Sequence, residues 1–323
     1  MDVELERVTY RFRHPITTAY GTLTEREVLV LRLRDEDGNE GLGEAAPLTA
    51  YDGVTLAQAE RAIRAGGGPP QGAAALDIAE ADLGSRIAGR PIAAARTARP
   101  TGAIPVNAAI GATDRAGAAW EAAAAVESGF GTVKLKVGVG DDAGRVAAVR
   151  AAVGPDVAIR IDANGAWDVD QAVAALRSLA PAGIEFCEEP VHGVAALAAV
   201  REQLGGEVAI AMDETVAEDG GLESGACDYV CLKVAACGGV TGVWDAADRA
   251  RAAGSEVYVA STYDGPIGIA AGLHAAAALG PDIPACGLAT LSLFDGVDDP
   301  FPVRDGRIEV PRGPGLGITW PLG

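Results

Sequence analysis

The chain has 323 residues, 49% of them hydrophobic, which is enough to fill the core of one large domain or of two. Asp and Glu number 45 against 26 Lys and Arg, and the formal charge of -19 excludes a general affinity for nucleic acid or anionic membrane surfaces. The sequence shows neither a secretion signal nor a long uninterrupted apolar window. We therefore expect a cytoplasmic protein that acts on a small molecule and binds no nucleic acid and no membrane.

Residues 1–53 alternate between apolar and polar side chains in three stretches, which predicts an antiparallel meander. Two segments with helical spacing follow at 55–65 and 73–89, and the breaker GGGPPQG separates them. The first hundred residues therefore predict a separate α+β unit.

Short apolar runs that end in charged residues recur through the middle of the chain. Runs of this length, bounded by Gly, Pro or acidic residues, are typical of buried strands. Ala-rich segments between them are each long enough for one helix, so the repeating unit is strand, loop, helix, as in a (β/α) barrel. The charged strands are expected at 133–138, 158–165, 184–190, 208–215 and 228–236.

The segments on either side complete the predicted barrel. We expect its first strand at 106–111, a further strand at 256–265 and the last at 286–294. In the tail, Asp305-Gly306 predicts a hairpin turn, and we expect the tail to return to the N-terminal unit.

The predicted fold class is α/β, a (β/α)7β TIM-like barrel with an α+β capping domain. The barrel is expected to span 101–294, and the capping domain to combine 1–100 with 295–323. The cysteines are odd in number and contain no CxxC pair, so we interpret them as small buried hydrophobic residues. They are Cys187, Cys227, Cys231, Cys237 and Cys286.

Lys134 and Lys136 are two residues apart on one predicted strand, so both ammonium groups point to the same side. The residues that alternate with them are apolar, which argues against a solvated lysine pair on an edge strand. Two lysines held together disfavour each other's charged form, which suits a base that works near neutral pH. Lys233 ends a later strand, roughly across the barrel from Lys136.

Asp162, Glu188 and Asp213 end the next three strands. A single acid at a strand end is usually a cap for the following helix, but three on consecutive strands argue against that interpretation for the group. Together they make an all-oxygen site for a hard divalent cation, Mg²⁺ for preference or Mn²⁺ in its place. Lysines beside such a cation suit the removal of a proton next to a carboxylate.

With these motifs the sequence resembles the enolase superfamily, and within it the muconate lactonizing enzyme subgroup, over nearly the whole chain. The matching signatures are KLK at 134–136, DAN at 162–164, EEP at 188–190, DE at 213–214 and the final Lys233. The resemblance, and not the spacing, selects the first acid of each doublet as the metal ligand. It also implies that Lys136 is the base, that Lys233 stays cationic opposite it, and that Lys134 contacts the substrate carboxylate.

The segments 260–280 and 285–294 resemble the o-succinylbenzoate synthases of actinobacteria. This resemblance implies the elimination of water from a small cyclohexadiene carboxylate in menaquinone biosynthesis. The substrate contacts that we expect are Ser261, Thr262, Asp264, Gly265 and Asn164.

Two alternatives remain open. An N-acylamino acid racemase or dipeptide epimerase would use the same residues, although AST at 260–262 replaces the GGM-type motif usual in the racemase branch. A non-catalytic binding protein is the other, and the complete set of lysines and acids argues against it. The oligomeric state is left open.

Overall fold

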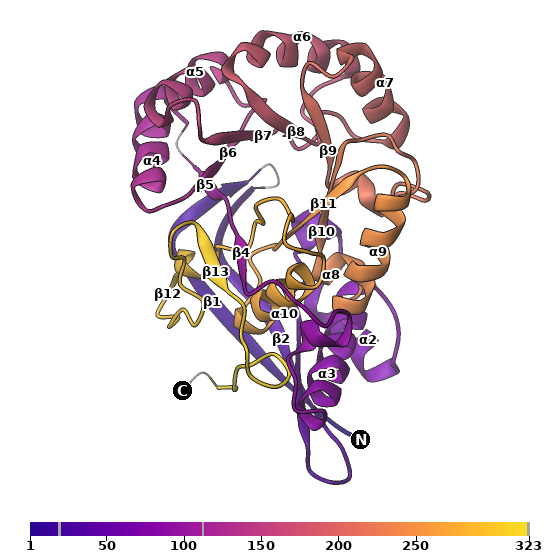
Figure 1. Ribbon diagram of the computed structural model, residues 1–323. Coiled ribbons are helices and arrows are strands. Elements are labelled where there is room, and N and C mark those ends of the chain that lie inside the picture. The colour runs from indigo at the N-terminus through magenta and orange to yellow at the C-terminus, as the bar shows by residue number, and fades with distance from the viewer. Residues whose placement is uncertain (19–20, 112, 322–323) are drawn as a thin grey trace.

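The computed structural model describes residues 1–18, 21–111 and 113–321. Two large sheets organise it. One is antiparallel and belongs mainly to the first part of the chain, and the other is parallel and curls around its own axis beneath a row of helices (Figure 1). This arrangement confirms the predicted α/β class.

The antiparallel sheet contains the predicted meander. Its first two strands pair from Asp2 to Thr18, with one shift of register between Arg11 and Ile16. A short fourth strand from late in the chain covers its outer edge. In sheet order the strands are β12 (Phe294–Asp295), β1 (Asp2–Thr18), β2 (Gly21–Arg34) and β3 (Glu40–Ala45).

Two helices pack beside this sheet, and both were predicted. They are α2 (Leu56–Ala65) and α3 (Pro70–Ile87), preceded by the short α1 (Thr49–Asp52) and followed by the 3-10 turn η1 (Ile92–Ala95). A capping box between Thr55 and Gln58 fixes the start of α2. Gly43 of β3 lies so close to α3 that a Cβ there would stand 1.9 Å from the carbonyl oxygen of Ala75.

The parallel sheet has seven strands in chain order, and each lies within or beside a segment predicted to be a strand. They are β5 (Ala108–Ile110), β6 (Thr132–Lys136), β7 (Ala158–Asp162), β8 (Ile184–Glu188), β9 (Ala209–Met212), β10 (Tyr229–Lys233) and β11 (Glu256–Ala260). All neighbours run parallel, so every carboxyl end opens on the same side.

Helices connect these strands and form the outer layer (Figure 1). They are α4 (Arg115–Glu127), α5 (Asp142–Val153), α6 (Val169–Leu179), η2 (Ala180–Ala182), α7 (Val194–Leu204), α8 (Val234–Cys237) and α9 (Val240–Ala252). The helix α10 (Pro266–Ala277) follows β11 and is buried along its whole length. No helix in the described residues is long and apolar enough to cross a membrane. The cytoplasmic location stays a prediction.

The expectation of one α-helix in every connection is wrong between β9 and β10. The described residues of that connection form only the 3-10 turn η3 (Glu214–Ala217). Gly220 and Gly221 follow within a few residues, and glycine is among the residues that least favour a helix interior.

The prediction of a single last strand at 286–294 is also wrong. Only its first two residues belong to the barrel, where Cys286 bridges to Val106 and Gly287 bridges to Ala260, which closes the gap between β5 and β11. The rest turns through η4 (Leu291–Leu293) into β12, which pairs with β1. The apolar run thus serves two sheets, and its composition does not reveal where it changes from one to the other.

The tail forms the predicted hairpin. Arg304 and Arg307 exchange two backbone hydrogen bonds of 2.8 and 2.9 Å across Asp305-Gly306, whose φ angles are 49° and 66°. Such a pair of left-handed residues is typical of a tight hairpin turn. Its second strand, β13 (Arg307–Glu309), pairs with β4 (Ala103–Pro105).

Beyond this hairpin the tail contacts the N-terminal unit. The backbone N–H of Leu316 donates to Asp82 of α3 at 2.7 Å, and the indole N–H of Trp320 donates to Glu6 of β1 at 2.8 Å. The exact division of the chain into domains at residues 100 and 294 stays a prediction.

Candidate active site

The lysines of β6 and the acids of β7 and β8 meet at the carboxyl ends of their strands. The register sets Lys136 beside Asp162, and Asp162 beside Glu188. Lys134 Nζ lies 2.6 Å from Glu188 Oε1 and 2.9 Å from Asp162 Oδ2, and Lys136 Nζ lies 3.3 Å from the same Asp162 oxygen. Both lysines therefore point into the barrel, on the side that their spacing predicts.

These groups are buried ions that hold one another in place. Asp162 is 3% exposed and Glu188 is 1% exposed. Burial alone would raise the pKa of Asp162, but Lys134 and Lys136 outweigh it and lower that pKa to about 2. Burial raises the pKa of Glu188, with Lys134 opposing the rise. For Lys134 burial lowers the pKa, but Asp162 and Glu188 prevail and raise it, so this lysine is held in its charged form.

Lys233 approaches from the other side of the barrel and forms an ion pair with Asp213. Its ammonium also donates to the hydroxyl of Tyr51 at 2.6 Å and lies 4.4 Å from the centre of the Tyr51 ring. The Tyr51 hydroxyl in turn donates to Asp213 at 3.1 Å. Burial opposes the charge of Lys233, but Asp213 prevails and raises the pKa of Lys233 well above its ordinary value.

Tyr51 belongs to α1, outside the barrel, and the sequence analysis did not single it out. No spacing pattern distinguishes it within the predicted meander, and in the structure the last strand of the meander ends earlier, at Ala45. Only the packing of α1 over the barrel mouth brings it to Lys233.

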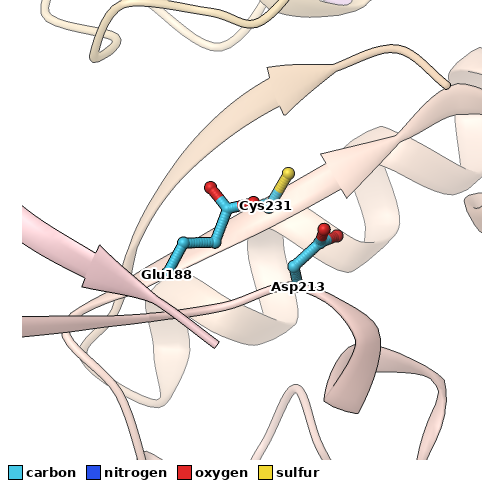
Figure 2. A group of neighbouring side chains, drawn as sticks. All are labelled: Glu188, Asp213 and Cys231. Atoms are coloured by element: carbon cyan, nitrogen blue, oxygen red, sulfur yellow. The ribbon is translucent and has the colours of Figure 1, made fainter. Parts of the chain in front are cut away.

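Acids at the carboxyl ends of β8 and β9 form a group that fits a metal ion. Figure 2 shows Glu188, Asp213 and Cys231 facing one another from neighbouring strands, and one ligand atom of each lies within 4.8 Å of the others. Two buried carboxylates suit a hard divalent cation. Asp162 is not a member of this group, but it lies close by, because it shares the ammonium of Lys134 with Glu188.

Two side chains were not predicted to take part in the site: Tyr258, which lies beside this group, and Cys231, which belongs to it. The hydroxyl of Tyr258 donates to Glu188 Oε2 from β11, so it holds one ligand candidate in place. Cys231, expected only as a buried hydrophobic residue, lines the same group. Burial raises the pKa of its thiol well above the ordinary value, so the thiol adds no charge. All five cysteines are free, and only Cys237 is not fully buried.

The second acid of the EEP doublet has a different role from the first. Glu189 is fully buried at φ 41° and accepts hydrogen bonds from the backbone N–H groups of Asp213, at 2.8 Å, and Thr215, at 3.1 Å. It therefore braces the end of β9. His192 and Glu214 lie beside it, and the three offer a second group of ligand atoms within 4.8 Å.

Asn164, one of the expected substrate contacts, lies between acids. Its backbone N–H donates to Asp162 at 3.0 Å, and its side-chain amide donates to Glu214 at 2.9 Å. Its φ of 43° turns the chain sharply after β7.

The other expected substrate contacts follow β11. The hydroxyls of Ser261 and Thr290 lie 3.0 Å apart, and Thr262 donates to Asp264 at 3.1 Å. Asp264 is only 3% exposed, and the N–H of Gly265 donates to Glu44 at 2.7 Å. Asp264 and Gly265 thus make their hydrogen bonds inside the protein.

The sequence matches the family described as "Enolase C-terminal domain-like" over residues 117–321, which is more than half of the chain. The chain belongs to the enolase superfamily. Among its relatives, the o-succinylbenzoate synthase of Thermobifida fusca (strain YX) is 36% identical over 313 residues, which cover 93% of this chain and 86% of that protein.

Solved structures of the superfamily share the fold. The dipeptide epimerase of Enterococcus faecalis V583, complexed with Mg and L-Leu-L-Tyr, is 27% identical, with a TM-score of 0.88 and coverage of 98% of both chains. The muconate lactonizing enzyme of Pseudomonas fluorescens, complexed with muconolactone, is 25% identical, with a TM-score of 0.89 and coverage of 100% of this chain and 96% of that one. An enolase-superfamily fold therefore supports several reactions, and the fold alone does not choose between them.

Proposed function

We propose that this enolase-superfamily protein is an o-succinylbenzoate synthase. It would eliminate water from 2-succinyl-6-hydroxy-2,4-cyclohexadiene-1-carboxylate. The observation that carries the proposal is the likeness to several proteins of that name, at 36% and 35% identity over 93% and 92% of this chain. The lysines and carboxylates at the barrel mouth supply the chemistry that such an elimination needs.

Asp162, Glu188 and Asp213 would hold Mg²⁺, or Mn²⁺ in its place. The donor set fits, because all three are buried carboxylates at the ends of neighbouring strands. The bound cation supplies positive charge against the substrate carboxylate, whose negative charge grows when the neighbouring proton leaves.

Lys136 is the residue that we assign as the base. Its side chain is 42% exposed, compared with 23% for Lys134, so it reaches furthest toward the mouth. It would take the proton from the carbon that bears the carboxylate and deliver it to the 6-hydroxyl, which departs as water from the same face. Lys134, deeper in the barrel, would contact the substrate carboxylate, and Lys233 would contribute positive charge on the opposite face.

The direct test is an assay of cyclohexadiene dehydration, in which the reaction is monitored as the loss of the diene's absorbance. Lys136→Ala should reduce kcat by at least about 100-fold, because general acid-base catalysis contributes about that much or more. Asp162→Asn, Glu188→Gln and Asp213→Asn should each abolish turnover and weaken Mg²⁺ binding measured by calorimetry.

Lys233→Arg is the control, because it keeps the charge on the opposite face and should retain part of the activity. Full activity in excess EDTA would contradict the metal assignment. Retention of more than a few per cent of the activity by Lys136→Ala would contradict the role of this base.

Epimerization is the second candidate function. The observation behind it is that the dipeptide epimerase shares the fold over 98% of both chains. Epimerization needs a neutral base on each face of the substrate, whereas a syn elimination needs only one. Each enantiomer of N-succinylphenylglycine can be incubated in D₂O with Mg²⁺ while deuteration and optical rotation are followed. The proposal predicts slow exchange at best. Fast exchange with inversion from both enantiomers, together with negligible dehydration, would replace the synthase by a racemase.

A further inference from the structure

Three successive strands of the antiparallel sheet contact the loop 261–265, which follows β11. From β1, the ring of Phe12 meets the ring of Tyr263 edge to face, with centres 5.4 Å apart. From β2, Arg26 donates to the carbonyl oxygen of Thr262 at 3.1 Å. From β3, Glu44 accepts the backbone N–H of Gly265 at 2.7 Å. Three of the four loop residues 262–265 are thus held by contacts from outside the barrel.

The backbone of this loop has an unfavourable conformation that depends on contacts with the rest of the protein. Tyr263 has φ 60°, in the left-handed region that a bulky residue rarely adopts. Such a conformation is unfavourable and is kept only where the surroundings enforce it. The contacts to Thr262 and Gly265 lie on either side of Tyr263, so they restrain the strained residue from both directions.

Arg26 and Glu44 are buried ionisable residues rather than parts of a solvated surface. They are 3% and 2% exposed. Arg26 also donates to the carbonyl oxygens of Ala46, at 2.6 Å, and Pro47, so one guanidinium joins the end of β3 to the loop after β11. Burying such groups is costly unless their hydrogen bonds are specific. The positions of Arg26 and Glu44 are therefore fixed by the hydrogen bonds that they make, including those to the loop.

Glu44 also lies at the start of α10, where Gly265 is the N-cap residue. A carboxyl oxygen there accepts a hydrogen bond from a backbone N–H that the helix itself leaves unpaired. Its Oε1 makes that bond, and its Oε2 is buried without a hydrogen-bond partner among the described residues. The carboxyl group thus links the sheet, the loop and the helix.

We propose that Arg26 and Glu44 are positioning residues for substrate binding, because they fix the conformation of the loop 261–265. Two of the expected substrate contacts, Ser261 and Thr262, belong to this loop. The identity of the ligand in this inference rests on the proposed function. The restraint on the loop is inferred only from the contacts described above. Removing these contacts should weaken substrate binding more than it slows the chemical step.

Asp82 offers a matched comparison. It is a second buried carboxylate of the same unit, with 0% exposure, and it accepts the backbone N–H groups of Leu42, at 2.8 Å, and Leu316, at 2.7 Å. It also pairs with Arg86. None of these partners lies in the loop 261–265, so a substitution there tests the general effect of losing a buried acid.

The experiment compares Glu44→Ala, Glu44→Gln and Asp82→Ala. Steady-state kinetics give KM and kcat, and hydrogen-deuterium exchange reports on residues 261–268. Glu44→Ala should raise KM about tenfold, which corresponds to about 1.4 kcal/mol, while kcat changes less, and it should speed exchange in the loop. Glu44→Gln keeps an acceptor for the N–H of Gly265 and should stay within about twofold of the wild type. Asp82→Ala should lower stability but leave KM and the exchange of the loop unchanged.

Arg26→Lys provides a second route if Glu44→Ala does not fold. A lysine keeps the charge but cannot reach three carbonyl oxygens at once, so KM and loop exchange should rise in the same way. Unchanged KM and loop exchange in Glu44→Ala and Arg26→Lys, or an equal rise of KM in Asp82→Ala, would overturn the inference. A wild-type protein that does not dehydrate the cyclohexadiene would defeat the proposed function, while the exchange data would still decide whether Arg26 and Glu44 hold the loop.

Discussion

Tyr51 contributes to the active site through a hydroxyl that serves two charged partners. It accepts a hydrogen bond from Lys233 at 2.6 Å and donates one to Asp213 at 3.1 Å. The hydroxyl therefore orients a lysine and a metal-ligand candidate at the same time. These two hydrogen bonds place the short α1 in direct contact with the candidate active site.

Tyr51→Phe should lower kcat/KM by about tenfold, because it removes hydrogen bonds to charged groups while keeping the ring beside Lys233. Steady-state dehydration kinetics provide the measurement. Tyr229→Phe is the control, since Tyr229 begins the strand that Lys233 ends and lies at the other end of the barrel. A tenfold loss in both variants would show that the effect does not depend on contact with Lys233.

His274 is a fully buried histidine whose titration should be visible in stability. Its Nε2 donates to the carbonyl oxygen of Leu316 at 3.2 Å, and burial lowers its pKa from the ordinary 6.5 to about 4. Above pH 6.5 the ring is neutral in both the folded and the unfolded chain. As the pH falls from 6.5 toward 4, only the unfolded chain takes up the proton, so stability is lost in that window.

Between pH 7.5 and pH 5, the free energy of unfolding of the wild type should therefore fall by about 2 kcal/mol more than that of His274→Gln. Glutamine can still donate to Leu316 but does not titrate. Urea unfolding at the two pH values gives the difference. Parallel pH profiles for the two proteins would show that His274 is not the group responsible.

At the scale of elements, the contact between β3 and α3 depends on the absence of side chains. A Cβ on Gly43 would stand 1.9 Å from the carbonyl oxygen and 2.9 Å from the carbonyl carbon of Ala75, and one on Gly41 would stand 2.1 Å from the carbonyl oxygen of Ala79. These are backbone atoms of α3, so the whole helix would have to move. Glu44 follows Gly43 directly, which ties this close approach to the position of the loop after β11.

Gly43→Ala should lower the free energy of unfolding by about 3 kcal/mol, at the upper end of the usual cost of overpacking. Gly84→Ala is the matched control, because Gly84 lies in α3 with open space where its Cβ would be. Alanine favours helices over glycine by about 1 kcal/mol, so this variant should be slightly more stable than the wild type. Denaturant unfolding distinguishes the two, and a similar small effect in both would mean that α3 can shift at little cost.

At the scale of the whole molecule, the sequence predicts most strands of the barrel because each ends its apolar run at a charge or a turn. It predicts the lysines and acids for the same reason, since parallel strands bring their carboxyl ends together. It does not predict Tyr51, Tyr258 or Cys231 as parts of the site, because their roles depend on contacts between distant segments. The composition of the run 286–294 predicts one strand, because composition cannot show that its two ends pair with different sheets.

The closure of the barrel by Cys286 and Gly287 has a consequence for how the protein is made. When a ribosome has released the chain only as far as residue 280, every predicted lysine and metal ligand is already present, yet the barrel is open between β5 and β11. The antiparallel sheet also lacks β12 at that stage. Domains generally begin to fold during synthesis. Here Cys286 and Gly287 close the barrel and Phe294–Asp295 complete the antiparallel sheet, so the growing chain has no closed barrel until this segment has been made.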